Sequence, residues 1–322
     1  MKTIDLELSS MNRREFFSLA AGIGASMFFL YPEFISFSLR NGNFYNAREE
    51  SLGIYQEKEL KTKQIFHKII IQANKESWAS LSIGECMGKI ALLFLETEYV
   101  AGTLEGEGPE ICRVDLTGLD CVTFFENVLC ISRILKKDKV SFDDFKDEII
   151  FTRYRAGIMT DYTSRLHYTS DWIYDNEKKK VVMNITKEIG GGEFPFKVSF
   201  MSKNPHYYQA LKEFPEFVET IANFEKEINK RNHWYIPQEK IKDVQKHIQT
   251  GDIIALATDK EGLDYGHTGL AYRDEMGKIR FLHASQKEKK VILDAELYEY
   301  TQSIETHTGI TVARPLEVMQ LK

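Results

Sequence analysis

The C-terminal part of the chain constrains the fold most, because it carries short segments rich in β-branched and aromatic residues, separated by glycine and charged turns. We expect strands of an antiparallel sheet at residues 252–257, 268–272, 278–283, 290–294 and 310–314. The preceding chain carries apolar side chains at helical spacing. We expect helices at residues 66–74, 81–97, 121–135, 141–155 and 206–230. Helices followed by strands predict an α+β domain with segregated elements.

Composition excludes some classes of function. The chain has 322 residues, of which 43% are hydrophobic and 28% are charged, so it can bury a large core. Its net charge of -6 argues against nucleic acid as a partner, because phosphate binding needs a clustered excess of Lys and Arg. No internal repeat, low-complexity tract or Pro/Ser linker interrupts the sequence, so we expect one domain after the N-terminal segment.

Residues 1–40 differ from the rest of the chain. Arg13 and Arg14 precede a weakly hydrophobic segment, LAAGIGASMFFL, that ends before Tyr31. Paired arginines before such a segment resemble a twin-arginine export signal, and the segment is shorter than the roughly 20 residues of a membrane-spanning helix. We therefore expect export to the periplasm or cell envelope without a stable membrane span; an N-terminal anchor helix is the alternative. No clear Ala-x-Ala motif follows, so cleavage is left open.

Four cysteines occur at positions 86, 112, 121 and 130. They are too few and too scattered for a disulfide scaffold, and whether Cys86 and Cys112 pair is left open. No two of them have the spacing of metal ligands and no histidine lies among them, so we expect no metal site.

Cys121 stands where a helix is expected to begin. Asp120 is a suitable N-cap, and Cys121 would be the first helical residue. Unpaired backbone amides and the helix dipole favour negative charge there, which predicts a thiolate and makes Cys121 a candidate nucleophile. Cys130 lies nine residues later, on the opposite face of the helix, and we expect it in the core.

Two histidines lie on neighbouring expected strands. His267 begins the strand that reaches Tyr272, and His283 ends the next strand. On paired antiparallel strands the two rings can be neighbours, so that one nitrogen of His267 faces His283 and the other faces a sulfur atom. The other histidines, most of which we expect to be surface or core residues, are at positions 67, 167, 206, 233, 247 and 307.

Five separated sequence elements resemble, in their order, those of the NlpC-type cell-wall cysteine hydrolases, circularly arranged relatives of the papain fold. They are Tyr99-Val100-Ala101-Gly102, Asp120-Cys121, Gly251-Asp252-Ile253-Ile254, His267 with Gly269, and Leu282-His283-Ala284-Ser285. The resemblance implies a papain-like core in which the nucleophile helix packs on an antiparallel sheet. It places the nucleophile on Cys121, the general base on His267 and a ring-orienting residue on His283, with no cofactor. The backbone amide of the nucleophile would help to bind the oxyanion.

The interval between Cys121 and His267 is longer than compact members of this superfamily need. It implies a large insertion at about residues 150–250 of a single catalytic domain, residues 41–322. Flat aromatic rings stack on sugar faces, and Arg, His and Asp bind sugar oxygens. On this basis the candidate substrate-binding residues are Tyr99, Asp120, Tyr154, Arg165, His167, Asp171 and Trp172. Packing within the core of the insertion is the alternative role for aromatic residues such as Trp172.

A longer pattern resembles one branch of the superfamily, the N-acetylmuramoyl-L-alanine amidase-like cysteine hydrolases. It consists of residues 120–126, Arg165-Leu166-His167-Tyr168 with Asp171-Trp172-Ile173, and residues 309–314. The branch implies cleavage between N-acetylmuramic acid and L-alanine in muropeptides or other peptidoglycan fragments, through a thioester. Two alternatives stay open: an endopeptidase that cuts between D-glutamate and the diamino acid, and a non-catalytic wall-binding module. The oligomeric state is also open.

Overall fold

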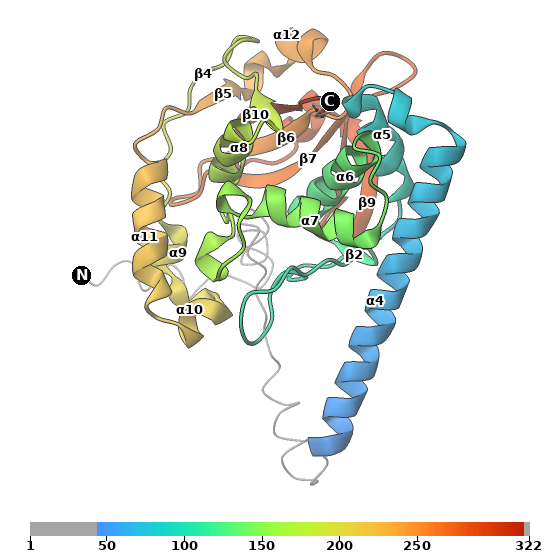
Figure 1. The fold of residues 1–322 in the computed structure, drawn as a ribbon. Helices are drawn as coiled ribbons and strands as arrows, with labels where there is room; N and C mark the ends of the chain where they lie inside the picture. Colours follow the sequence, from blue (N-terminus) through green and yellow to red (C-terminus); the bar gives the residue numbers. More distant parts are fainter. Residues whose placement is uncertain (1–43, 319–322) are drawn as a thin grey trace, which may run out of the picture.

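We analysed a computed structural model of the chain, which describes residues 44–318. Helices occupy most of the first part of this range and long strands the last part (Figure 1). This arrangement confirms the expected α+β class. The expected export signal, residues 1–40, lies outside the described residues.

A single sheet organises the fold. Its long antiparallel strands are β6 (Ile253–Thr258), β7 (Tyr265–Arg273), β8 (Ile279–Ser285), β9 (Lys290–Glu296) and β10 (His307–Pro315). The short strands are β1 (Glu98–Tyr99), β2 (Gly118–Leu119), β3 (Val182–Asn184), β4 (Gly192–Glu193) and β5 (Trp234–Pro237). The strand order is β2-β1-β9-β8-β7-β6-β10-β5-β4, with β3 also paired to β10. Strands β6 to β9 therefore form a meander, and β10 returns beside β6.

All five predicted strands are present, and two of them begin earlier than expected. Strand β7 begins at Tyr265 and β10 at His307, each three residues before the predicted start. The pairing of β6 with both strands shifts register near these ends. A bulge adds a residue to one strand, which breaks the period of two that the sequence pattern relies on. The earlier starts place His267 and His307 inside the sheet.

The predicted helices are present, but the first begins 22 residues before its predicted start at residue 66, and the helix at Thr169–Lys178 was not predicted. The longer ones are α4 (Phe44–Lys75), α5 (Ile83–Leu93), α6 (Cys121–Lys136), α7 (Phe142–Arg153), α8 (Thr169–Lys178) and α11 (Phe217–Ile228). The short ones are α9 (Phe200–Lys203), α10 (Gln209–Glu213), α12 (Ile241–Val244) and α13 (Leu297–Gln302). The predicted helix 206–230 is divided into α10 and α11 at Pro215, which lacks the N–H that a continuous helix requires. Figure 1 shows the N-terminal end of α4 extending away from the sheet.

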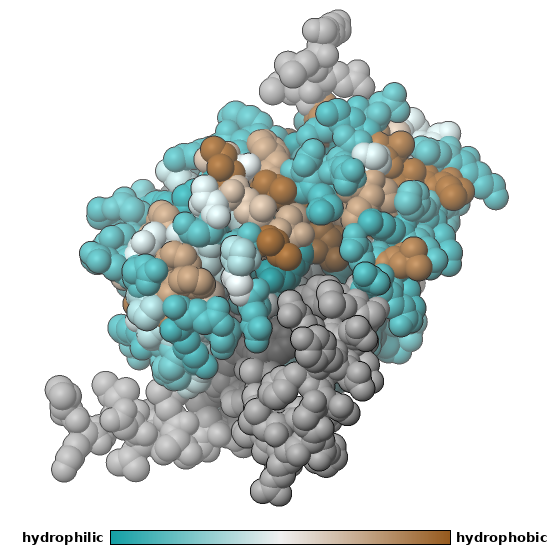
Figure 2. Space-filling model, turned by 60° about the horizontal axis from the view of Figure 1, so that its bottom comes forward, coloured by the Kyte–Doolittle hydropathy of each residue, from teal (hydrophilic) through white to brown (hydrophobic). Residues whose placement is uncertain are grey.

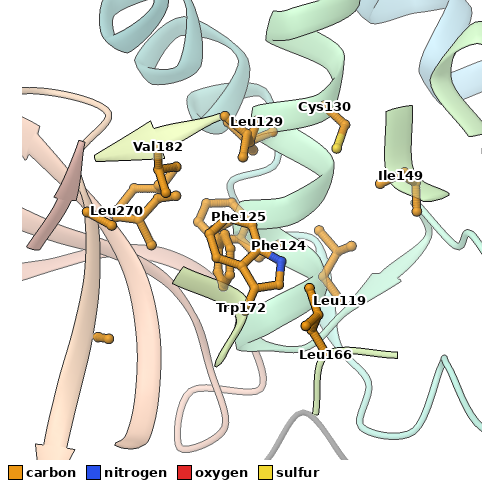
Figure 3. Close-up of a cluster of buried hydrophobic side chains, with 14 of the residues drawn as sticks. Leu119, Phe124, Phe125, Leu129, Cys130, Ile149, Leu166, Trp172, Val182 and Leu270 are labelled. Atoms are coloured by element: carbon orange, nitrogen blue, oxygen red, sulfur yellow. The ribbon is translucent and has the colours of Figure 1, made fainter. Parts of the chain in front are cut away.

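Helix α6 is the centre of the larger hydrophobic core. It lies between α5 and α7 and packs against β7 and β8. Phe124, Phe125 and Leu129 of α6 pack with Leu270 of β7 and Trp172 of α8 (Figure 3). Because this helix is buried on nearly all sides, its first residue is held firmly against the sheet.

A second hydrophobic cluster covers the other face of the sheet. Ile254, Leu256, Phe281 and Val312 belong to it, while Ile253 and Ala255 of the same strand β6 face the α6 side. This alternation follows from the two-residue period of a strand, and both faces are apolar because both are covered.

The described surface is mostly hydrophilic. Figure 2 shows one face on which hydrophobic side chains are scattered among hydrophilic ones. The largest exposures of apolar side chains are those of Leu60, Ile71, Ile158 and Met276, which are isolated in sequence. Among residues 44–318 no helix combines the length and apolar character that crossing a bilayer requires.

Candidate active site

The helix start at Cys121 is built as predicted. Asp120 is the N-cap of α6: its Oδ1 accepts hydrogen bonds from the amides of Val122 at 3.0 Å and Thr123 at 2.8 Å. Thr123 Oγ1 in turn accepts from the Asp120 amide at 2.9 Å. Such a cap stabilises a helix by about 1 kcal/mol. The Asp120 carboxylate, 5% exposed, therefore serves the helix terminus.

Cys121 is buried beside the first half of β7. Thr268, the residue after His267, lies next to its sulfur atom, and Tyr99 of β1 is a further neighbour. Burial raises the pKa of the Cys121 thiol to about 12; Asp120 adds to the rise, and Thr268 opposes it. Burial therefore favours the protonated thiol and opposes the thiolate that the helix terminus favours.

His267 and His283 contact each other directly. Their strands β7 and β8 pair antiparallel, and His267 Nε2 lies 2.7 Å from His283 Nδ1. The rings are 7% and 1% exposed. Burial lowers the pKa of both imidazoles, so both are neutral at pH 7. A neutral imidazole has one donor and one acceptor nitrogen, so one ring must donate to the other.

Three residues that the sequence analysis did not single out surround this pair. Asp294 Oδ2 of β9 lies 3.2 Å from His283 Nε2. The ring of Tyr300, on α13, lies with its centroid 4.9 Å from that of His283 and 6.5 Å from that of His267. His307, the first residue of β10, is centred 6.2 Å from Tyr300. Burial raises the pKa of the Tyr300 hydroxyl, and Asp294 and Cys121 add to the rise, which places this tyrosine near the thiol as well.

A sequence signal existed for only one of these residues. His283 pairs with Ile292 of β9, so Asp294, two positions along, is a diagonal neighbour on the same face of the sheet. Tyr300 lies on a short helix whose position depends on tertiary packing. His307 lies before a register shift, which hides it from the strand pattern.

The His267 side of the site opens into a cavity of about 740 Å³. Asp294, Tyr300 and His307 line it together with His267 and the cation Lys260. Asp294 is the most open of the polar groups bonded to the histidines, with 31% of its side chain exposed.

Three of the candidate substrate-binding residues meet in a small pocket next to Cys121. Arg165, His167 and Trp172 line it with Val122, which directly follows Cys121. Arg165 Nη2 donates to Glu105 Oε1 at 2.8 Å, and His167 Nε2 lies 2.8 Å from the carbonyl oxygen of Tyr162.

Trp172, Tyr154 and Asp171 are also held by partners within the protein. The indole N–H of Trp172 donates to Glu126 at 2.9 Å, and its ring meets Phe125 edge to face in the core (Figure 3). The Tyr154 hydroxyl donates to Glu110 at 2.7 Å. Asp171 accepts from two arginines, each at 2.6 Å. These three side chains are only 1–2% exposed, so they pack beneath the surface of the site. For Trp172 this agrees with the alternative role given above, packing within the core of the insertion.

The remaining cysteines do not line the cavity at His267 or the pocket beside Val122. Cys86 and Cys112 are free thiols, so they do not pair. Cys130 is buried, as predicted, and its sulfur lies 3.2 Å from the Thr152 hydroxyl. Within residues 44–318, no group of three or more His, Cys, Asp or Glu side chains is arranged to hold a metal ion.

Comparison with a family model described as N-acetylmuramoyl-L-alanine amidase-like gives a match over residues 89–310, which include Cys121, His267 and His283. A comparison with curated proteins returned no match.

Solved structures from three bacteria are similar to this chain. An N-acetylmuramoyl-L-alanine amidase from Bacteroides uniformis is 33% identical, with a TM-score of 0.69, over 72% of this chain and 98% of its own. A putative xylanase from Bacteroides fragilis is 36% identical, with a TM-score of 0.66, over 70% of this chain and 98% of its own. A Legionella pneumophila protein is 22% identical, with a TM-score of 0.59, over 83% of this chain and 97% of its own, and shows the fold alone.

Proposed function

The chain belongs to the N-acetylmuramoyl-L-alanine amidase-like family, and we propose that it hydrolyses the bond between N-acetylmuramic acid and L-alanine in peptidoglycan fragments. The family and its amidase-named neighbour support a peptidoglycan amidase at the coarse level. The observation that carries the finer proposal is the position of Cys121 at a capped helix start, beside the residue that follows His267.

We assign the nucleophile to Cys121 and the general base to His267. The sulfur attacks the amide carbonyl carbon while His267 accepts the thiol proton. The protonated His267 gives this proton to the departing amine as the C–N bond breaks, which leaves a thioester on Cys121. His267 then deprotonates a water molecule that hydrolyses the thioester and restores the thiol. Because thiol and imidazole are both neutral at rest, proton transfer accompanies the attack.

The oxyanion of the tetrahedral intermediate needs donors near the sulfur. We assign the backbone amide of Cys121 to this role, because it lies in the first turn of α6, where the positive end of the helix dipole stabilises negative charge. The hydroxyl of Tyr99, a neighbour of Cys121 in the site, is the second donor.

The sugar side of the substrate is assigned to the region of Arg165 and His167; the pocket there, beside Val122, has a volume of only about 20 Å³ and must widen to admit a sugar. Arg165 and His167 line it, and they supply the charged and polar groups that muramoyl oxygens need.

A xylanase activity, suggested by the name of one neighbour, is not favoured. A glycosidase places two carboxyl groups on either side of the scissile bond. Three carboxylates near Cys121 and His267 already have partners: Asp120 caps α6, Glu126 bonds to Arg153 at 2.8 Å and to Trp172, and Asp294 bonds to His283. Glu288 and Glu299 also line the cavity at His267, so cleavage of xylan requires a direct assay.

Mass spectrometry of muropeptides incubated with the full-length protein tests the proposal. An amidase releases a peptide with a new L-alanine amino terminus, whereas the endopeptidase alternative liberates a sugar-dipeptide. Cys121→Ala should abolish turnover, and Cys112→Ala, which removes a free thiol outside the site, should not. Full turnover by Cys121→Ala would exclude the cysteine mechanism. Intact muropeptides with cleaved xylan would support a glycosidase instead.

A further inference from the structure

The hydrogen-bonded series that starts at His267 continues past His283. His267 Nε2 lies 2.7 Å from His283 Nδ1, and His283 Nε2 lies 3.2 Å from Asp294 Oδ2. We propose that Asp294 is a positioning residue that fixes the tautomer of His283 and, through it, the tautomer of His267. The inference deepens the proposed function, because it states which nitrogen of the general base carries the lone pair.

The Asp294 carboxylate fixes the position of the first proton. The hydrogen bond from His283 lowers the pKa of Asp294, so this group is ionised at neutral pH and can only accept hydrogen bonds. His283 must therefore carry its proton on Nε2. Because the His283 ring is neutral, its Nδ1 is then an acceptor.

The tautomer of His283 in turn fixes the tautomer of His267. An acceptor at His283 Nδ1 requires the proton of His267 to be on Nε2, which donates across the 2.7 Å contact. His267 is neutral, so its lone pair is on Nδ1. This nitrogen faces away from His283 and is the one available to take the thiol proton.

Without Asp294 the pair of rings has a second arrangement. His283 can carry its proton on Nδ1 and donate to His267 Nε2, which places the His267 proton on Nδ1. The number of hydrogen bonds between the rings is unchanged, but His267 Nδ1 then carries a proton and has no lone pair to accept another. The charge-assisted bond to Asp294 selects the productive arrangement.

Packing holds the rings while Asp294 selects the proton positions. The His283 ring stacks on Phe281 at a centroid distance of 4.5 Å and also meets Tyr300. Asp294 is anchored because Arg280 Nε donates to its carbonyl oxygen at 2.6 Å. Since its carboxylate is on the wall of the open cavity, with 31% exposure, its replacement leaves the core intact.

Other charged or titratable groups act on this series. Lys287 lowers the pKa of Asp294, and His307 is electrostatically coupled to both histidines. Tyr300 faces both rings from α13. A variant test must therefore distinguish Asp294 from its neighbours, and Glu299, an exposed carboxylate of the same cavity, provides a matched control.

Long-range proton–nitrogen NMR of full-length protein labelled with ¹⁵N-histidine reads each tautomer directly. The wild type and Asp294→Asn should both carry the His283 proton on Nε2, because an amide oxygen still accepts. Asp294→Ala should shift His283 toward the Nδ1-protonated form, and Glu299→Ala should not. A wild-type His283 protonated on Nδ1, or a tautomer unchanged in Asp294→Ala, would overturn the inference.

Kinetics provide the second measurement. Asp294→Ala should lower kcat about 10-fold or more with little change in KM, since general-base catalysis contributes about 10² to 10⁴ in rate. Asp294→Asn should recover most of this loss. In a His283→Ala background the Asp294→Ala change should have no further effect, and an additive loss would contradict action through His283. The NMR measurement needs no turnover. If the protein had no amidase activity, the proposed function would be refuted, and the NMR spectra would still decide the tautomer assignment.

Discussion

Acid should destabilise this protein through His307, and the structure allows the effect to be calculated. Burial lowers the pKa of His307 from 6.5 to about 4, with Lys260 and His283 contributing. The unfolded chain then binds more protons than the folded protein between these two values. The contribution of neutral His307 to the unfolding free energy is therefore fully present above about pH 6.5 and is lost as the pH decreases toward 4.

The magnitude follows from the size of the shift. A shift of one pKa unit corresponds to about 1.4 kcal/mol, so His307 alone should remove about 2 kcal/mol of unfolding free energy between pH 7 and pH 5. Other buried histidines act in the same direction, and Asp264, whose pKa burial raises to about 6, acts in the opposite one. A comparison of variants at the same two pH values cancels these shared contributions.

Urea unfolding followed by tryptophan fluorescence measures the effect. Between pH 7 and pH 5 the His307→Gln protein should lose about 2 kcal/mol less than the wild type. His67→Gln, at an exposed histidine of α4, is the matched control and should behave as the wild type. Equal losses in His307→Gln and the wild type would refute the reasoning. Because each variant is compared with itself, a constant destabilisation by glutamine does not affect the result.

Three further outcomes are expected. Arg153→Met should cost about 3 to 5 kcal/mol in urea unfolding, because it leaves the Glu126 carboxylate buried without its cation; a loss below 1 kcal/mol would contradict this. Asp120→Ala should lower the unfolding free energy by about 1 kcal/mol, because the N-cap of α6 is lost. Asp120→Asn, which keeps an acceptor oxygen, should retain most of this stability. Equal losses in the two variants, measured by calorimetry, would show that the cap is unimportant. Residues 1–40 are proposed to direct export, so replacing Arg13 and Arg14 by lysines should retain the protein in the cytoplasm, as cell fractionation with immunoblotting would detect.

Local patterns in the sequence were sufficient for much of the fold and part of the candidate site. The start of α6 after Asp120 was predictable because an N-cap is a contact between residues adjacent in sequence. The antiparallel pairing of β7 with β8 was predictable because a short turn between two β-rich segments leaves few other arrangements. Cys121, His267 and His283 were therefore identifiable as candidates before the structure was considered.

The surroundings of these residues were decided by the tertiary structure. Trp172 and Asp171 are residue types that often bind sugars, yet both are buried and bonded to other protein side chains. The sequence could not show this, because burial depends on which elements cover a residue. The protonation of Cys121 follows the same rule, since desolvation by the surrounding elements opposes the local helix terminus. Asp294 reaches His283 only because β9 pairs with β8 in one register. The sequence by itself determined the candidate reactive groups and the elements that carry them, because caps and periodicities are local. Only the tertiary structure decided their protonation and hydrogen-bond partners, because solvation and long-range contacts depend on the whole fold.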